Sequence, residues 1–265
     1  GYNVAVGYEA GNDITSGINN TLIGALAGDA LTTGNRNVAI GYEALSAEDG
    51  NGRNVAVGYQ SLLTQNTGAE AYNVAIGHQA GKLVEAGAFN TLIGGQAGDA
   101  LTTGSYNSLV GVNSGGALTT GAQNVAFGQG ALATNTTGST NTALGDSSLS
   151  ANTTASNNTA VGQAALAANT TGGENTALGK DAGAGCTTGA SNVALGFRSL
   201  YTSSTASKNV PIGDSALRAF SGSGDGNNTA VGHSALTANT TGAQMTALGT
   251  LALAASTTAT GCTAL

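Results

Sequence analysis

The sequence predicts an all-β fold: a parallel β-solenoid (β-roll) of about 15 coils with a 17-residue repeat. Three observations predict it. A short Asn-x-Ala-x-Gly-like phrase returns sixteen times, thirteen of the fifteen intervals share the same seventeen-residue length, and Gly stands fifth in all fifteen complete copies. A fixed period of this length is typical of coils that stack on their neighbours. The phrase begins at Asn3, Asn20, Asn37, Asn54, Asn73, Asn90, Asn107, Asn124, Asn141, Asn158, Asn175, Asn192, Asn209, Asn228, Met245 and Cys262.

We therefore expect residues 1–265 to form a single β-solenoid repeat domain. The two remaining intervals, 54 to 73 and 209 to 228, are longer than the others, which predicts two-residue insertions in the coils 54–72 and 209–227. An insertion that leaves the next phrase unchanged belongs in a turn, since the stacked strands must keep their register.

Counting each coil from its Asn, positions 2 to 4 predict a short strand, as in residues 38–40. Position 4 is a sizeable apolar residue in every copy, and we expect it to point into the roll. Position 3 then points the other way. It is mostly Ala, with Leu22, Leu92 and Leu109 as the large exceptions. This apolar second face favours a covering sister chain, and the alternative is that Ala and a few Leu residues tolerate exposure to water. Gly at position 5 predicts a turn with positive φ, and the Ala or Ser at position 8 indicates a narrow interior.

Position 1 predicts an amide ladder, in which each Asn side chain hydrogen-bonds the next coil, for example at Asn20, Asn37, Asn54 and Asn158. Positions 9 and 12 compensate each other. Nine coils carry Leu at position 9, such as Leu166; the other six carry Gly there and an apolar residue at position 12, such as Leu31, Leu101 or Cys186. Because interiors pack to near-crystal density, we expect one large core residue per coil from either position.

Composition excludes several classes of function. The formal charge of -7 and the seven scattered Lys and Arg residues argue against nucleic acid as a partner. No apolar run approaches the roughly 18 residues of a membrane span, so we expect no membrane insertion. The two histidines, His78 and His233, share position 6 but lie nine coils apart, and no catalytic, metal or phosphate-binding motif appears. We expect neither enzyme activity nor a cofactor.

Two surface features stand out. Aromatic residues gather in the N-terminal half, where they predict either a glycan-contact stripe or packing between chains: Tyr8, Tyr42, Tyr59, Tyr72, Phe89 and Tyr106. A charged turn with Glu48, Asp49 and Asn51 is compatible with a calcium ion or, more simply, with a solvated loop.

The repeat resembles the head repeats of trimeric autotransporter adhesins, the YadA-like family, and related repeats of bacteriophage tail-fibre proteins. The residues that carry the resemblance are Asn37-Val38-Ala39-Ile40-Gly41, Asn158-Thr159-Ala160-Val161-Gly162 and the following Ala165-Leu166. The resemblance implies a left-handed β-roll, a side-by-side homotrimer and attachment to a host surface. The coil is longer than in the familiar adhesin heads, and no neck, coiled-coil stalk or membrane anchor accompanies it.

The sequence thus leads us to expect a fragment of a longer extracellular fibre, on a virion tail or a bacterial cell surface. Its loops would contact a cell-surface glycan or receptor. Two alternatives stay open: a self-assembling structural filament, and an ice-binding solenoid that aligns the Thr residues of positions 13 and 14, such as Thr170 and Thr171.

Overall fold

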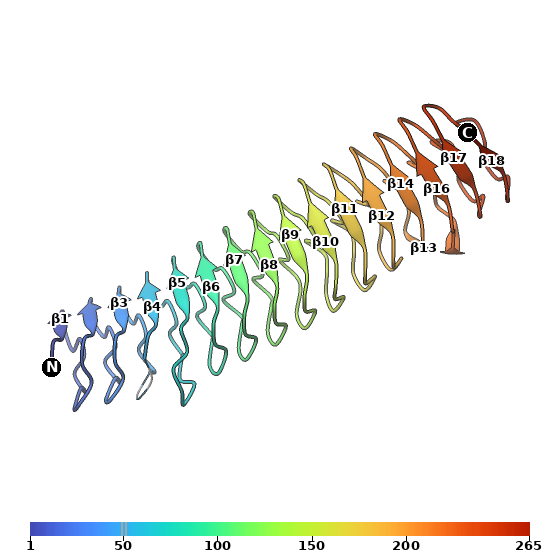
Figure 1. Ribbon diagram of the computed structural model, residues 1–265. Coiled ribbons are helices and arrows are strands. Elements are labelled where there is room, and N and C mark those ends of the chain that lie inside the picture. The colour runs from blue at the N-terminus through green and yellow to red at the C-terminus, as the bar shows by residue number, and fades with distance from the viewer. Residues whose placement is uncertain (49, 51) are drawn as a thin grey trace. The chain divides into compact units, whose positions relative to one another are not determined.

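The chain is a parallel β-solenoid of about 15 turns with a repeat of about seventeen residues (Figure 1). The computed structural model describes residues 1–48, 50 and 52–265, and within these ranges it contains strands and turns but no helix. The coils fall into two compact units, Gly1–Thr137 (unit 1) and Gly138–Leu265 (unit 2). The all-β solenoid and its period are confirmed, whereas the single repeat domain stays a prediction.

Almost every coil contributes one strand of two or three residues at positions 2 to 4, as expected. In unit 1 these strands are β1 (Val4–Val6), β2 (Thr21–Ile23), β3 (Val38–Ile40), β4 (Val55–Val57), β5 (Val74–Ile76), β6 (Thr91–Ile93), β7 (Ser108–Val110) and β8 (Val125–Phe127). In unit 2 they are β9 (Thr142–Leu144), β10 (Thr159–Val161), β11 (Thr176–Leu178), β12 (Val193–Leu195), β14 (Val210–Ile212), β16 (Thr229–Val231), β17 (Thr246–Leu248) and β18 (Thr263–Ala264). Unit 2 adds a second pair, β13 (Thr205–Ser207) and β15 (Ser223–Asp225).

Within each unit, successive strands pair in parallel and place equal repeat positions side by side. Val38 pairs with Val55, and Val55 pairs with Val74 although the coil between them carries the two-residue insertion. The extra residues therefore lie outside the strands and do not disturb the register. The ladder thins between β12 and β14, where the bridged pair is Leu195 with Ile212. Pro211 stands in the middle of β14 and, lacking a backbone N–H, cannot donate there.

The strands face the opposite way from our expectation. Position 3 points into the roll: Ala39, Ala56 and Leu92 are fully buried. Position 4 points outward, and Val6, Phe127 and Leu178 keep 48–58% of their surface exposed. The interior already holds the large side chain of position 9 or 12, so it has room beside the strand for Ala more often than for Val or Ile. The prediction that position 4 fills the core and position 3 awaits a sister chain was wrong.

A local rule explains where Gly replaces Leu at position 9. The three Leu residues at position 3, Leu22, Leu92 and Leu109, fill the volume that a position-9 side chain would need. A Cβ built on Gly28, in the coil of Leu22, would lie 2.9 Å from Leu22 Cδ2, and one built on Gly11, in the coil before, 2.7 Å from Leu22 Cδ1. The same relation holds around Leu92 and Leu109, so it accounts for Gly11, Gly28, Gly81, Gly98 and Gly115.

Gly at position 5 ends each strand in a conformation closed to other residues. Its φ lies between 119° and 141° in all fifteen complete coils. The backbones of stacked coils also meet at this point, because a Cβ on Gly94 would lie 2.5 Å from the carbonyl oxygen of Gly111. Positive φ and close backbone approach together make this glycine the fixed corner of the coil, as expected.

Candidate functional surface

The position-1 asparagines form a continuous buried ladder inside each unit. The backbone N–H of Asn37 donates to Oδ1 of Asn20 over 2.9 Å, and that of Asn54 donates to Oδ1 of Asn37 over 3.0 Å. Asn158 Nδ2 donates to the carbonyl of Gly172 in its own coil over 2.9 Å. Each amide therefore ties two coils and closes its own coil across the interior. Met245 continues the row only as a donor, through its N–H to Asn228 Oδ1.

The residues expected to fill the core lie inside the coils. Leu31, Leu101 and Cys186 are fully buried, and Leu166 is 1% exposed. Burial raises the pKa of the Cys186 thiol to about 12, against a small opposing effect of the Ser203 hydroxyl. A group held neutral in this way fills volume and does not act as a nucleophile at neutral pH.

A second buried polar row was missed in the sequence. Where position 9 is Leu, the polar residue at position 12 also lies inside, as at Asn152, Asn169 and Asn239. Asn169 Nδ2 donates to Asn152 Oδ1 over 3.1 Å and to the Gly172 carbonyl over 2.9 Å. The recurrence of Asn, Gln and Ser at this position was the available signal, since a short amide can satisfy the backbone of a turn.

The aromatic residues form two stacked columns, both in unit 1. In the first, at position 6, the Tyr42 and Tyr59 ring centroids lie 5.6 Å apart and those of Tyr59 and His78 lie 5.2 Å apart. In the second, at position 17, Phe89 stacks between Tyr72 at 5.5 Å and Tyr106 at 5.0 Å. Tyr8 is separated from the first column by the coil that carries Ala25 at position 6. The structure therefore joins five of the six predicted aromatics into two groups and leaves Tyr8 apart.

Stacking covers the ring faces that a sugar would use. Tyr59 has a neighbouring ring on each face, and so has Phe89, with interplanar angles of 7–13°. The outer face of Tyr72 is covered by the Arg53 guanidinium, 5.1 Å from the ring centroid. The columns thus offer water mainly ring edges and hydroxyls. A face-on glycan stripe along them has little ring surface left, although each aromatic keeps more than 40% of its surface exposed.

Carboxylates sit beside two of the hydroxyls. A hydrogen bond to the neighbouring Glu9 raises the pKa of Tyr8, and Glu43 does the same to the pKa of Tyr42. Because a nearby negative charge opposes phenolate formation, both hydroxyls remain donors at physiological pH.

The insertion in coil 54–72 is fastened to the second column. Glu70 Oε2 lies 2.5 Å from Arg53 Nη1, and the Tyr72 hydroxyl donates to Glu70 over 3.1 Å. Of the predicted acidic turn, Asp49 and Asn51 lie outside the described residues, and Glu48 is buried, with its carboxylate 3.5 Å from Asn54 Nδ2. Across residues 1–48, 50 and 52–265, His, Cys, Asp and Glu side chains gather nowhere in a group of three that could hold a metal ion.

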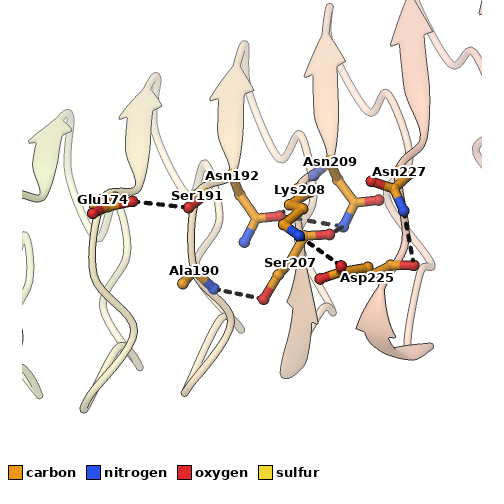
Figure 2. A network of polar contacts seen from close by, with 9 residues as sticks. All are labelled: Glu174, Ala190, Ser191, Asn192, Ser207, Lys208, Asn209, Asp225 and Asn227. Atoms are coloured by element: carbon orange, nitrogen blue, oxygen red, sulfur yellow. Dashed lines mark hydrogen bonds and ion pairs between the residues drawn. The ribbon is translucent and has the colours of Figure 1, made fainter.

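In unit 2 the corresponding edge is polar (Figure 2). Glu174 accepts a hydrogen bond from the Ser191 hydroxyl over 3.1 Å, and Lys208 Nζ lies 2.6 Å from Asp225 in the second insertion. Asp225 belongs to β15, which pairs with β13 through Ser207. This short second sheet replaces a plain turn and holds Asp225 of the second insertion beside Lys208, the position-17 residue of the preceding coil.

The outer face of the strands is uncharged throughout, with an apolar residue at position 4 of every coil. We use this name for positions 2 and 4: position 2 is Val, Thr or Ser, position 4 is Val, Ile, Leu or Phe, and neither carries a charge in any coil. Position 17 borders the outer face where the strand begins (the start edge), and position 6 borders it where the strand ends (the end edge). The described residues enclose no detectable cavity. None of them forms a helix with the length and apolar character needed to cross a membrane.

Comparison with protein-family models, with curated proteins and with solved structures gives no match.

Proposed function

We propose that the chain is a segment of a structural or adhesive fibre in which three copies lie side by side, each a left-handed roll. The observation that carries this proposal is the uncharged outer face, with its continuous row of apolar residues at position 4 of every coil. Scattered exposed apolar residues are ordinary on a protein surface, but a contiguous apolar face marks an interaction site. A sister chain that presents the same repeat would match this face coil by coil.

Covering this face contributes free energy of the same order as the cost of association. Full burial of a Val, Leu or Phe side chain contributes about 1.5–3 kcal/mol. Some position-4 residues, such as Val6, Phe127 and Leu178, are about half exposed, but most keep a smaller fraction of their surface exposed. Each coil would therefore contribute about 0.5 kcal/mol and fifteen coils about 8 kcal/mol per chain. Association costs an estimated 4–15 kcal/mol in lost translational and rotational freedom. The two free energies are of the same size, and the contribution from burial grows with the number of coils.

Recognition belongs to loops in this proposal and not to the outer face. Rigid scaffolds with variable loops commonly place binding residues on those loops. The insertion 65–70 and the β13–β15 corner are the two departures from the regular coil, and both are fixed by ion pairs. Such loops suit contact with a cell-surface glycan or receptor, on a virion tail fibre or a bacterial surface. The role proposed is non-catalytic and extracellular.

The ice-binding alternative loses one of its two ranks of hydroxyls. Thr170 Oγ1 donates to the carbonyl of Thr187 in the next coil over 3.0 Å. Thr187 Oγ1 donates in the same way to the carbonyl of Ser204 over 2.8 Å. Only position 14, as at Thr171, remains fully in water. A single rank interrupted at Gly50 and Ala86 presents no ordered two-dimensional array. Thermal hysteresis measured at millimolar protein would revive this alternative.

The solution mass of the purified chain, measured by light scattering over a range of concentrations, tests the proposal. One chain has a mass of 25.4 kDa, and a measured mass three times as large supports the trimeric fibre. A mass of 25.4 kDa at all concentrations contradicts it. Polymers of indefinite length support the alternative of a filament that grows end to end.

A further inference from the structure

We infer that the two edges of the outer face recognise each other between chains: the start edge of one copy packs against the end edge of the next, at equal coil height. This rests on the proposed side-by-side trimer and specifies its contact. A closed ring of three copies has only heterologous interfaces, so one edge of the face meets the other edge of a neighbour.

Equal height fixes which residues meet. Each strand is preceded by a start-edge residue, position 17 of the coil before, and followed by an end-edge residue, position 6 of its own coil. These two residues lie six apart in the sequence, as Glu174 and Lys180 do. An extended segment of six residues spans about 20 Å, so the partners cannot touch within one chain. The three-fold axis of a side-by-side trimer runs along the stacking direction. It therefore brings position 17 of one chain to position 6 of the next.

In unit 2 the charges on the two edges are complementary. Glu174 lies opposite Lys180, and Lys208 lies opposite Asp214. Lys180 and Asp214 are both exposed, and no ion pair is formed by either among the residues that the structure describes. Lys208 already pairs with Asp225 over 2.6 Å, but an ammonium has three donors and that pair is itself half exposed.

In unit 1 the same rule pairs cations with aromatic rings. Arg36 lies opposite Tyr42, which has Glu43 beside it, and Arg53 lies opposite Tyr59. Arg36 can cover the face of Tyr42 that has no neighbouring ring, a contact that is more favourable when water is excluded. Because rings cover both faces of Tyr59, Arg53 would instead donate to the Tyr59 hydroxyl. Further along, the bulky start-edge residue Phe89 meets Gly95, the smallest end-edge residue.

The complementarity also fixes the register. All four charged residues of the start edge (Arg36, Arg53, Glu174 and Lys208) meet an opposite charge or a Tyr ring, and none meets a like charge. A shift by one coil would place Glu174 against Gln163 or Phe197, and Lys208 against Phe197 or His233. Such a shift removes both ion pairs. The aromatic columns then lie in the contact between chains. Their ring edges and hydroxyls, which stacking leaves open, would face the neighbouring chain.

The area involved is of the right size. Eight strands spaced about 4.8 Å apart, with edges about 20 Å apart, give unit 1 an outer face of roughly 800 Å². Stable protein interfaces bury about 800 Å² on each partner. Because two neighbours share this face, unit 1 supplies about 400 Å² to each interface, and unit 2, with a similar face, brings the total to about 800 Å².

Disulfide trapping tests the pairing. In a Cys262→Ser background, the double variant Glu174→Cys/Lys180→Cys is oxidised and run on a denaturing, non-reducing gel. The inference predicts a covalent trimer closed by three disulfides, since a pair about 20 Å apart cannot close within one chain and Cα atoms must come within about 7 Å. The second pair, Lys208→Cys/Asp214→Cys, gives the same result and guards against a variant that fails to fold.

Controls separate this inference from the proposed function. Each single cysteine variant should remain monomeric on the gel; a covalent dimer from Glu174→Cys alone would show a two-fold interface and overturn the pairing. The pair Glu174→Cys/Gln163→Cys, one coil out of register, should lose most of the covalent trimer. A trimeric mass by light scattering with no covalent trimer from either matched pair overturns the edge pairing alone. A monomeric mass overturns the trimeric fibre itself.

Discussion

Replacing Asn158 by Ala tests whether the buried amide ladder holds the coils together. Asn158 is fully buried and makes two side-chain hydrogen bonds that Ala cannot make. Its Oδ1 accepts from the backbone N–H of Asn175 over 2.9 Å, and its Nδ2 donates to the carbonyl of Gly172 over 2.9 Å. Both partners are buried. The Asn175 N–H would be left without a partner, whereas the Gly172 carbonyl would keep the hydrogen bond from Asn169 Nδ2.

Leaving a buried polar group unsatisfied costs about 1–3 kcal/mol, and losing the second hydrogen bond costs about 0.5–1.5 kcal/mol, so the substitution predicts a loss of about 1.5–4.5 kcal/mol in the free energy of unfolding. Urea unfolding followed by circular dichroism, with linear extrapolation, measures this difference. Thr171→Ala, at an exposed position of the same coil away from the outer face and its edges, is the matched control and should change stability by no more than about 0.5 kcal/mol. If Asn158→Ala were as stable as this control, the ladder would not be a source of stability.

Three further predictions concern the glycines and the core. Gly94→Ala should abolish or severely reduce folding, because φ is 132° and the new Cβ would lie 2.5 Å from a carbonyl oxygen; Gly95→Ala, with no atom within 4 Å of its Cβ, should fold normally, as expression and circular dichroism would show. Gly183→Leu should lower stability by about 1–3 kcal/mol through overpacking, and adding Cys186→Asn should restore most of it in a double-mutant cycle, since the pair then matches the Leu/Asn pattern of coil 158. The Cys186 thiol should resist alkylation at pH 8 until the chain is unfolded, whereas Cys262 reacts. Because the pKa of Cys186 is raised to about 12 in the folded state, its stabilising effect is present below about pH 9 and should fall progressively from pH 9 to 12. Equal alkylation of both thiols, or unchanged stability in that range, would contradict the buried-thiol assignment.

The sequence was sufficient for the features that depend on period and on glycine. A short repeat of fixed length requires stacking, and an invariant Gly after a short strand requires a turn that no other residue makes. Two further features could be predicted for a related reason: the amide ladder at Asn37, and the filling of the core from position 9 in one coil (Leu166) and from position 12 in another (Cys186). Buried amides need partners, and each coil has room for one large side chain.

The sequence did not reveal which face of each strand points into the core. Positions 3 and 4 are both apolar, so alternation gave no polar marker for the outer side, and size favoured the wrong residue. Leu92 shows why: a large residue enters the core at position 3 only where Gly81 and Gly98 make room. The stacking of Tyr59 and the burial of Asn169 depend on neighbours one coil away. A list of repeat positions does not display those neighbours until the coils are stacked.

The reactivity of a thiol on the outer face tests the central claim most directly. In the Cys262→Ser background, Phe127→Cys places the thiol at position 4, which is 48% exposed in the single chain, and Thr120→Cys places it at an exposed position 14. If three chains cover the outer face, a bulky maleimide should modify Phe127→Cys roughly tenfold or more slowly than Thr120→Cys, and the rates should become equal in urea. Equal rates in the native protein would mean that the outer face is open to water and that the fibre is not built by packing these faces together.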